Sequence, residues 1–204
     1  MIHTALSFIT NELNEYLKLR TGTPGVDRVF LTSVATESGG VVIPDKSLGL
    51  SLINIEEERV YKDQRTSQVN SQGNVEYLNP EIKLNLYILI SANFQDTKAN
   101  DSTDDYVEGL KQLSFIISFF QARNVFTPEN SPSLADYDPN IHKLVVELYS
   151  YSFEQLYNFW SVVGTKYLPS VLYKVRVVTF QEKEIFGSGA PIEKIRIDSK
   201  TKEP

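Results

Sequence analysis

The chain opens with apolar residues at the spacing of one helix face. Between residues 2 and 19 they recur at i, i+3, i+4 and i+7, and polar side chains such as Asn14 fall off that stripe. Gly22 and Pro24 then interrupt the repeat. The pattern predicts an amphipathic helix with one buried face.

Two further segments carry helix signals. A second helix is predicted from Ser102 to about Arg123, with Ser102 as its cap. Apolar residues occupy most of its circumference, so we expect it to be packed on more than one side. Ser152 and Gln155 have the spacing of a capping box, which predicts a third helix that stops at Gly164.

Alternating apolar residues predict five strands, at residues 29–34, 48–59, 83–94, 143–151 and 171–180. In the second strand the alternation on Leu48, Leu50 and Leu52 shifts to Ile53 and Ile55. A shift of one residue exchanges the two faces of a strand. We therefore expect a β-bulge or a strong local twist at this point.

Polar segments mark the parts that lie beyond the core. Residues 61–79 are rich in Gln, Asn and Ser, and a structureless loop of that length would be unusual inside a compact domain. We interpret them as the outer end of an extended β-hairpin. Residues 126–140 contain three prolines and predict a connection. Residues 181–204 are polar with scattered isoleucines, and predict a C-terminal arm or tail.

Together these elements predict an α/β fold in which helices flank a mixed, mainly antiparallel sheet. The predicted organisation is one domain over residues 1–180, followed by the arm at 181–204. A chain of 204 residues is long enough to bury a core of its own.

Composition narrows the classes of partner. The net charge of −6 and the pI near 5.0 give no basic surface for nucleic acid or anionic lipid. The chain has no cysteine, which fits folding in a reducing compartment. The first residues lack the pattern of a signal peptide, and no apolar run is long enough to cross a membrane. We expect no nucleic-acid partner and no membrane insertion.

Candidate chemistry is sparse. The histidines His3 and His142 are isolated in the sequence, and no phosphate-binding glycine motif is present. The acidic run 56–58 is the best metal candidate, yet on a strand Glu56 and Glu58 share one face while Glu57 points away. Acidic residues at 101, 104 and 105 fit the start of a helix rather than a calcium loop. We predict no enzyme activity, no cofactor and no bound metal.

Tyrosines gather late in the chain, and we expect core packing to account for about half of them. A protein interface suits the others, because tyrosine supplies apolar area and a hydrogen-bonding tip together. The cluster comprises Tyr149, Tyr151, Tyr157, Tyr167 and Tyr173.

Four segments carry a resemblance to a known family. They are residues 50–59 (LSLINIEEER), 85–94 (NLYILISANF), 113–121 (LSFIISFFQ) and the run 145–176. Over residues 48–179, in consistent order, the chain resembles the N-terminal domain of cap, or tail-terminator, proteins of phage-tail-like contractile injection systems. The extracellular antifeeding-prophage and virulence-cassette types are the most similar. The first turns of the N-terminal helix and residues 61–79 match less well.

The resemblance implies a structural subunit that forms a hexameric ring and terminates the inner tube and sheath. Its partners would be copies of itself and the tube and sheath subunits, after synthesis in the bacterial cytoplasm and incorporation into a particle. Alternatives are a cap or tube–sheath adaptor, and a plug that binds cargo. As the assembly interface we predict Glu56, Glu57, Glu58, Arg59, Tyr61, Tyr77, Ile185, Phe186, Ile192, Ile195 and Ile197.

Overall fold

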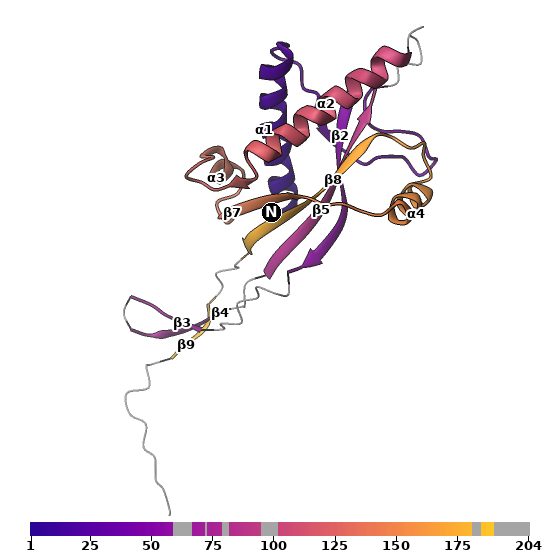
Figure 1. Cartoon of the computed structure of the whole chain (residues 1–204). Helices are drawn as coiled ribbons and strands as arrows, with labels where there is room; N and C mark the ends of the chain where they lie inside the picture. The colour runs from indigo at the N-terminus through magenta and orange to yellow at the C-terminus, as the bar shows by residue number, and fades with distance from the viewer. Residues whose placement is uncertain (59–66, 72, 79–81, 95–101, 181–184, 190–204) are drawn as a thin grey trace, which may run out of the picture.

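The computed structural model describes residues 1–58, 67–71, 73–78, 82–94, 102–180 and 185–189 (Figure 1). Four helices are described: α1 (Ile2–Thr21), α2 (Ser102–Ala122), α3 (Ser133–Tyr137) and α4 (Phe153–Val163). The larger sheet contains β1 (Val29–Leu31), β2 (Ser47–Glu57), β5 (Ile82–Asn93), β6 (Val125–Phe126), β7 (Lys143–Leu148) and β8 (Ser170–Phe180). The smaller sheet contains β3 (Ser67–Val69), β4 (Val75–Leu78) and β9 (Ile185–Gly189).

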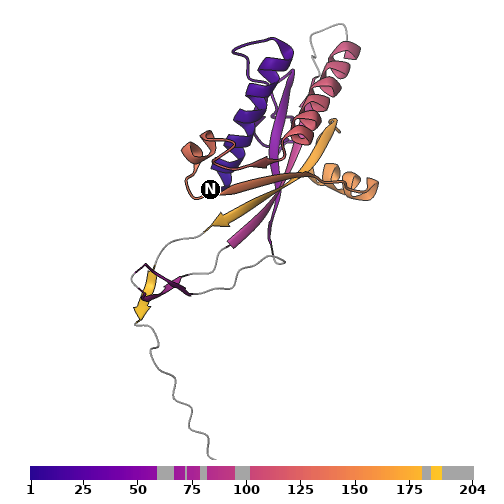
Figure 2. The ribbon, with the colours of Figure 1, turned by 60° about the vertical axis from the view of Figure 1, so that its left-hand side comes forward.

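The larger sheet has the strand order β1-β2-β5-β8-β7-β6. Strands β1 and β2 are parallel, and every other pair in the sheet is antiparallel. The prediction of a mixed, mainly antiparallel sheet with flanking helices is confirmed. The long central strands β2, β5 and β8 form the middle of the sheet, with helices on both of its faces (Figures 1 and 2).

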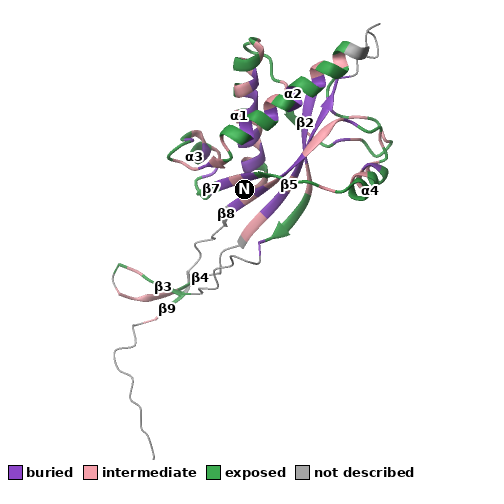
Figure 3. Ribbon diagram, in the orientation of Figure 1, coloured by how far each residue is buried: buried purple, intermediate pink, exposed green. Residues whose placement is uncertain are grey.

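Each face of the sheet has its own apolar cluster, because successive residues of a strand point to opposite sides. On β5, Ile88 and Ile90 belong to the larger cluster with α1, α2 and α3. Leu89 lies between them and belongs to the smaller cluster, where it packs with Trp160 of α4. Figure 3 shows the buried residues along the middle of the sheet and the inner side of α1. Helix α4 therefore covers the face opposite to α2.

Helix α1 matches its predicted span, but Asn14 contradicts the predicted polar face. Its side chain is buried, and it hydrogen-bonds the backbone of the edge strand β1. The amide Nδ2 donates to the carbonyl oxygen of Val29 at 2.9 Å, and Oδ1 accepts from the backbone N–H groups of Arg28 and Val29. Asn14 thus holds the edge strand against the helix by pairing backbone groups that would otherwise be unsatisfied.

The predicted phase change in β2 is a β-bulge. The register of β2 against β5 shifts between Leu52 and Asn54, so that Leu52 pairs with Ile88 and Asn54 pairs with Tyr87. After the bulge, Asn54 shares the sheet face of Tyr87, the face opposite to Ile88. The bulge therefore moves the second half of β2 onto a different set of neighbours.

Helix α2 is where the sequence prediction was wrong. Its inner residues Leu113, Ile116 and Phe120 are buried, but Val107 and Leu110 on its outer side are exposed. The described residues therefore cover α2 on one side only. The helix also begins at Ser102 itself, so Ser102 is its first helical residue rather than the cap before it.

The connection after α2 contains two short elements, which were not predicted because the three prolines indicated only a loop. Strand β6 pairs with β7, and α3 follows Pro132. Leu134 of α3 is fully buried against the larger cluster. Proline is compatible with the first turn of a helix, because the backbone N–H that it lacks has no partner there in any case.

The predicted extended hairpin is present as β3 and β4, which pair antiparallel with Val69 opposite Val75. Strand β9 of the predicted arm pairs with β4, so hairpin and arm form one small sheet, in the order β3-β4-β9. We call it the hairpin–tail sheet. Figure 1 shows it apart from the larger sheet. The pairing of β9 was not expected, and the boundary at residue 180 stays a prediction.

Candidate assembly interface

The structure describes only part of the predicted interface. Arg59, Tyr61, Ile192, Ile195 and Ile197 lie outside the described residues. Of Ile185 and Phe186, only the backbone position at the start of β9 is described. Tyr77 lies in β4, opposite Gly187 of β9, and its side chain is half exposed. The three glutamates lie at the end of β2.

Glu56 and Glu58 follow the bulge, and their cross-strand neighbours fix the face that they share. Glu56 pairs with Asn85, and the Tyr87 hydroxyl donates a 2.9 Å hydrogen bond to Glu56 Oε2. Glu58 is buried, and Asn85 Nδ2 donates to its Oε2 at 3.2 Å. Glu57 pairs with Leu84 and so lies on the opposite face. The shared face of Glu56 and Glu58 is as predicted, but both side chains already have partners within the chain.

The same face continues as a polar surface across the neighbouring strands. Tyr149 packs edge-on against Tyr87, with ring centroids 5.2 Å apart. On the next two strands, Arg176 of β8 forms a 3.1 Å ion pair with Glu147 of β7. Partial burial and the hydrogen bond to the Glu56 carboxylate together raise the pKa of Tyr87 to about 12. Tyr87 therefore keeps its proton, and remains a hydrogen-bond donor, throughout the physiological pH range.

The hairpin–tail sheet has two outer strands. In the described part of the chain, β3 and β9 each pair with β4 alone, so each has one edge without a strand partner. Such an edge presents backbone N–H and C=O groups that can accept a strand from another chain. The sheet is thus suited to contact with a neighbouring protein.

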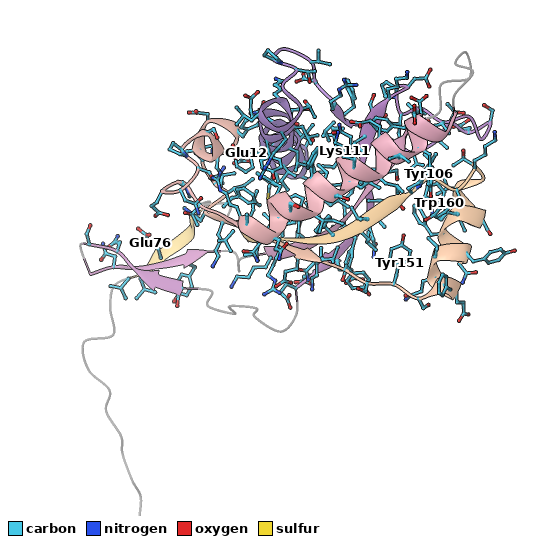
Figure 4. All side chains as sticks on the ribbon, turned by 45° about the horizontal axis from the view of Figure 1, so that its top comes forward. Glu12, Glu76, Tyr106, Lys111, Tyr151 and Trp160 are labelled. Carbon is cyan, nitrogen blue, oxygen red and sulfur yellow. The ribbon has the colours of Figure 1, made fainter. Side chains whose placement is uncertain are left out.

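A hollow beside α4 was not predicted as a site, although its tyrosines were noted as interface candidates. We call it the α4 groove. It has a volume of about 520 Å³, and five of its lining residues are Phe153, Leu156, Tyr157, Trp160 and Tyr167. An adjoining hollow of about 330 Å³ shares three of them and extends along Tyr149 and Tyr151. Figure 4 shows Tyr151 and Trp160 at this end of the molecule.

The core takes fewer of the clustered tyrosines than the expected half. Only Tyr173 is buried, in the larger cluster, whereas Tyr157 and Tyr167 are exposed at the α4 groove. Tyr149 is also exposed, and Tyr151 is half-buried. Trp160 packs edge-on against Tyr167, with ring centroids 5.5 Å apart. Phe153, the first residue of α4, leaves 90% of its surface exposed. Large aromatic side chains that are this exposed are typical of protein-binding surfaces.

The remaining candidates for chemistry are not brought together. His3 and His142 are both exposed, and within the described residues no three His, Cys, Asp or Glu side chains are grouped as a metal site would require. Asp104 and Asp105 lie in the first turn of α2, where negative charge is favourable. Asp101 lies outside the described residues. Among the helices that the structure describes, none could span a membrane.

Comparison with known proteins identifies the family. The family described as the Pvc16 N-terminal domain matches residues 5–194, which is nearly the whole chain. The chain belongs to the Pvc16 N-terminal domain family. This agrees with the resemblance found in the sequence, and the match includes the hairpin–tail sheet. No curated protein matches the chain.

Two solved structures are similar to this chain. One is the sheath/tube terminator of an extracellular contractile injection system in its extended state, with 15% identity and a TM-score of 0.52. The other is the tube-terminating cap of the anti-feeding prophage, with 14% identity and a TM-score of 0.48. Each likeness covers 94% of this chain. The chain spans 63% of the terminator and 60% of the cap.

Proposed function

We propose that the chain is a structural cap subunit of a contractile injection system. Copies of it form a closed ring of six that ends the inner tube and the sheath, and the role requires no catalysis and no cofactor. The observation that carries the proposal is membership of the Pvc16 N-terminal domain family, together with a fold that is similar to a sheath/tube terminator over 94% of the chain.

A cap has a specific mechanical task. Tubes and sheaths grow by head-to-tail contacts that do not close on themselves, so each layer offers the same face to the next. Growth stops when a ring binds the last layer and presents no equivalent face. A subunit of such a ring needs one surface for its neighbours in the ring and another for the layer below.

We propose that the hairpin–tail sheet is the surface that contacts the layer below. Its edges at β3 and β9, which no other described strand pairs with, support this assignment, because strand addition joins chains through backbone hydrogen bonds without any cofactor. Tyr77 lies on β4, between these edges, and would add apolar area to such a contact. The arm and the hairpin would then act together rather than as separate attachments.

The experiment uses the purified full-length chain and a variant without residues 185–204. Analytical ultracentrifugation and electron microscopy measure the mass and shape of each, and binding to purified tubes and sheaths is scored at their ends. We expect both proteins to form six-membered rings, because the larger sheet contains no residue of the deleted segment. Only the full-length ring should bind tube or sheath ends.

The outcomes separate the parts of the proposal. A monomeric full-length chain would contradict the ring. A truncated ring that still binds ends as tightly as the full-length ring would contradict the role of the hairpin–tail sheet alone. Normal particles that lack only their cargo, after loss of the chain from cells, would favour a cargo-binding plug instead.

A further inference from the structure

We propose that neighbouring copies in the ring are joined by the α4 groove of one copy and the outer side of α2 of the next. The inference rests on the proposed ring and names the contact that builds it. The outer side of α2 is here called the α2 stripe, and it consists of Val107, Leu110, Ser114, Ile117 and Ser118.

The α4 groove exposes a large part of the aromatic surface that one partner contributes to an interface. Phe153, Tyr157 and Tyr167 leave 90%, 72% and 56% of their surfaces exposed. At roughly 150–250 Å² per aromatic side chain, these three expose about 400 Å². A standard interface buries about 800 Å² on each partner, so the groove supplies about half of one side. A permanent contact between identical chains is the natural use of so much aromatic surface.

The indole of Trp160 lies beneath the exposed rings of the groove. Trp160 is 7% exposed and lines the groove, and its indole Nε1–H has no partner among the described residues. Less than 1 Å² of Nε1 is exposed, so a partner that lies in the groove contacts the exposed rings of Phe153, Tyr157 and Tyr167 rather than this donor.

The α2 stripe supplies an apolar surface that such a groove can hold. Val107, Leu110 and Ile117 are exposed apolar residues on one side of the helix. Between them, the hydroxyls of Ser114 and Ser118 donate to the carbonyl oxygens four residues earlier, at 2.8 and 2.9 Å. Each hydroxyl donor is therefore satisfied within its own helix and can be covered by an apolar surface without losing that bond. A helix whose apolar side lies in an aromatic groove is a recurrent mode of recognition.

The arrangement suits a head-to-tail contact. Helix α2 covers the sheet face of the larger cluster and α4 covers the other face, and the α2 stripe and the α4 groove share no residue. One copy can therefore use both surfaces at once, each against a different neighbour. A contact between two different surfaces generates rings when the rotation between copies closes. The proposed contact would also cover the exposed side of α2, where the sequence predicted packing.

The test uses two exposed substitutions and a matched control. Tyr157→Lys places a charge in the α4 groove, and Val107→Lys places one on the α2 stripe. Val162→Lys is the control, because Val162 is 88% exposed on the same helix but does not line the groove. Circular dichroism checks folding, and light scattering after size-exclusion chromatography gives the number of subunits. Trp160 is the only tryptophan of the chain, so its fluorescence reports on the groove directly.

We expect Tyr157→Lys and Val107→Lys to be folded monomers, with subunit association weakened at least about thirtyfold, as for an interface hot spot. Val162→Lys should form the same ring as the unmodified chain. A mixture of the two monomeric variants should form dimers and nothing larger, because it contains one intact pair of surfaces. Trp160 fluorescence should change when that dimer forms.

Other results would overturn the inference. A Tyr157→Lys or Val107→Lys ring that is as stable as the unmodified ring would remove these surfaces from the contact, while leaving the proposed ring standing. A Tyr157→Lys ring that no longer binds tube or sheath would assign the groove to those subunits instead. An unmodified chain that stays monomeric would contradict the proposed ring, and this contact with it.

Discussion

The hydroxyl of Tyr87 donates a 2.9 Å hydrogen bond to the carboxylate of Glu56, a residue 31 positions earlier in the chain. The β-bulge between Leu52 and Asn54 makes this contact possible, because it places Glu56 on the sheet face of Tyr87. A polar surface next to the end of β2 therefore depends on one irregularity in the strand register.

Charge reversal at Glu56 tests the proposed part of the β2 glutamates in assembly. Glu56 is exposed and can be changed to Lys at a small cost in folding, whereas Glu58 is buried and bonded to Asn85. If the glutamates contact a neighbouring subunit, Glu56→Lys will weaken the ring or alter particle length. Glu37→Lys, at another exposed position, is the control. Equal ring stability and particle length for both variants would remove Glu56 from the interface.

Replacement of Asn14 tests how α1 holds the edge strand. In Asn14→Ala the backbone N–H groups of Arg28 and Val29 and the carbonyl of Val29 lose their partner. We expect the free energy of unfolding to fall by about 2–3 kcal/mol, the cost of leaving buried backbone groups unpaired. Asn11→Ala, at an exposed position of the same helix, should change it by less than about 0.5 kcal/mol. Urea denaturation measures both, and equal losses would contradict the bonding.

Two tyrosines with raised pKa values predict a loss of stability at high pH. Burial raises the pKa of Tyr173 to about 12, and partial burial together with the hydrogen bond to Glu56 raises that of Tyr87 to about 12. Above pH 10 the unfolded chain loses these protons while the folded chain keeps them, so the free energy of unfolding falls as pH rises from about 10 to 12. Tyr173→Phe and Tyr87→Phe should each reduce this fall, as measured by denaturation between pH 8 and pH 11.

The same two substitutions should differ at pH 8. The Tyr173 hydroxyl is buried and has no hydrogen-bond partner within the described residues, so Tyr173→Phe should leave stability unchanged or raise it by about 1 kcal/mol. Tyr87→Phe removes the bond to Glu56 and should lower stability. A large loss for Tyr173→Phe would mean that its hydroxyl is paired in solution.

Asp138 should contribute to folding stability at neutral pH, and this contribution should be lost in acid. Burial alone would raise its pKa, but hydrogen bonds from the Asn140 backbone N–H and the Thr4 hydroxyl, with the Met1 α-amino group, hold the pKa below its ordinary value. The stabilisation is therefore complete above the unfolded pKa, near 4, and is lost as pH falls through the lower folded value. Asp138→Asn should be less stable at pH 7 and should lose less stability below pH 4. A parallel acid profile for both proteins would contradict these bonds.

Periodicity in the sequence predicts most of the fold because the long strands and helices bury regular apolar patterns. The shift from Leu52 to Ile53 even locates the bulge. The pattern fails at Asn14, since a buried amide that pairs with a distant backbone has the same local signature as a solvent-exposed one. It also fails at α3, where Pro132 indicates a break although a short helix follows.

The sequence predicts less of the candidate site than of the fold. The pairing of β9 with β4 joins segments that lie more than 100 residues apart along the chain, and neither strand contains a strong apolar alternation. The α4 groove depends on how α4 meets the segment of Tyr167, which spacing along one helix does not reveal. The apolar positions around most of α2 were visible in the sequence, but their pattern does not show which of them the described residues bury.

The length of particles made in cells that lack this chain tests the central claim most directly. A cap that ends the tube and sheath predicts sheaths of uncontrolled length, measured by electron microscopy, and normal length once the intact chain is restored. Particles of normal length and normal stability in its absence would contradict that claim.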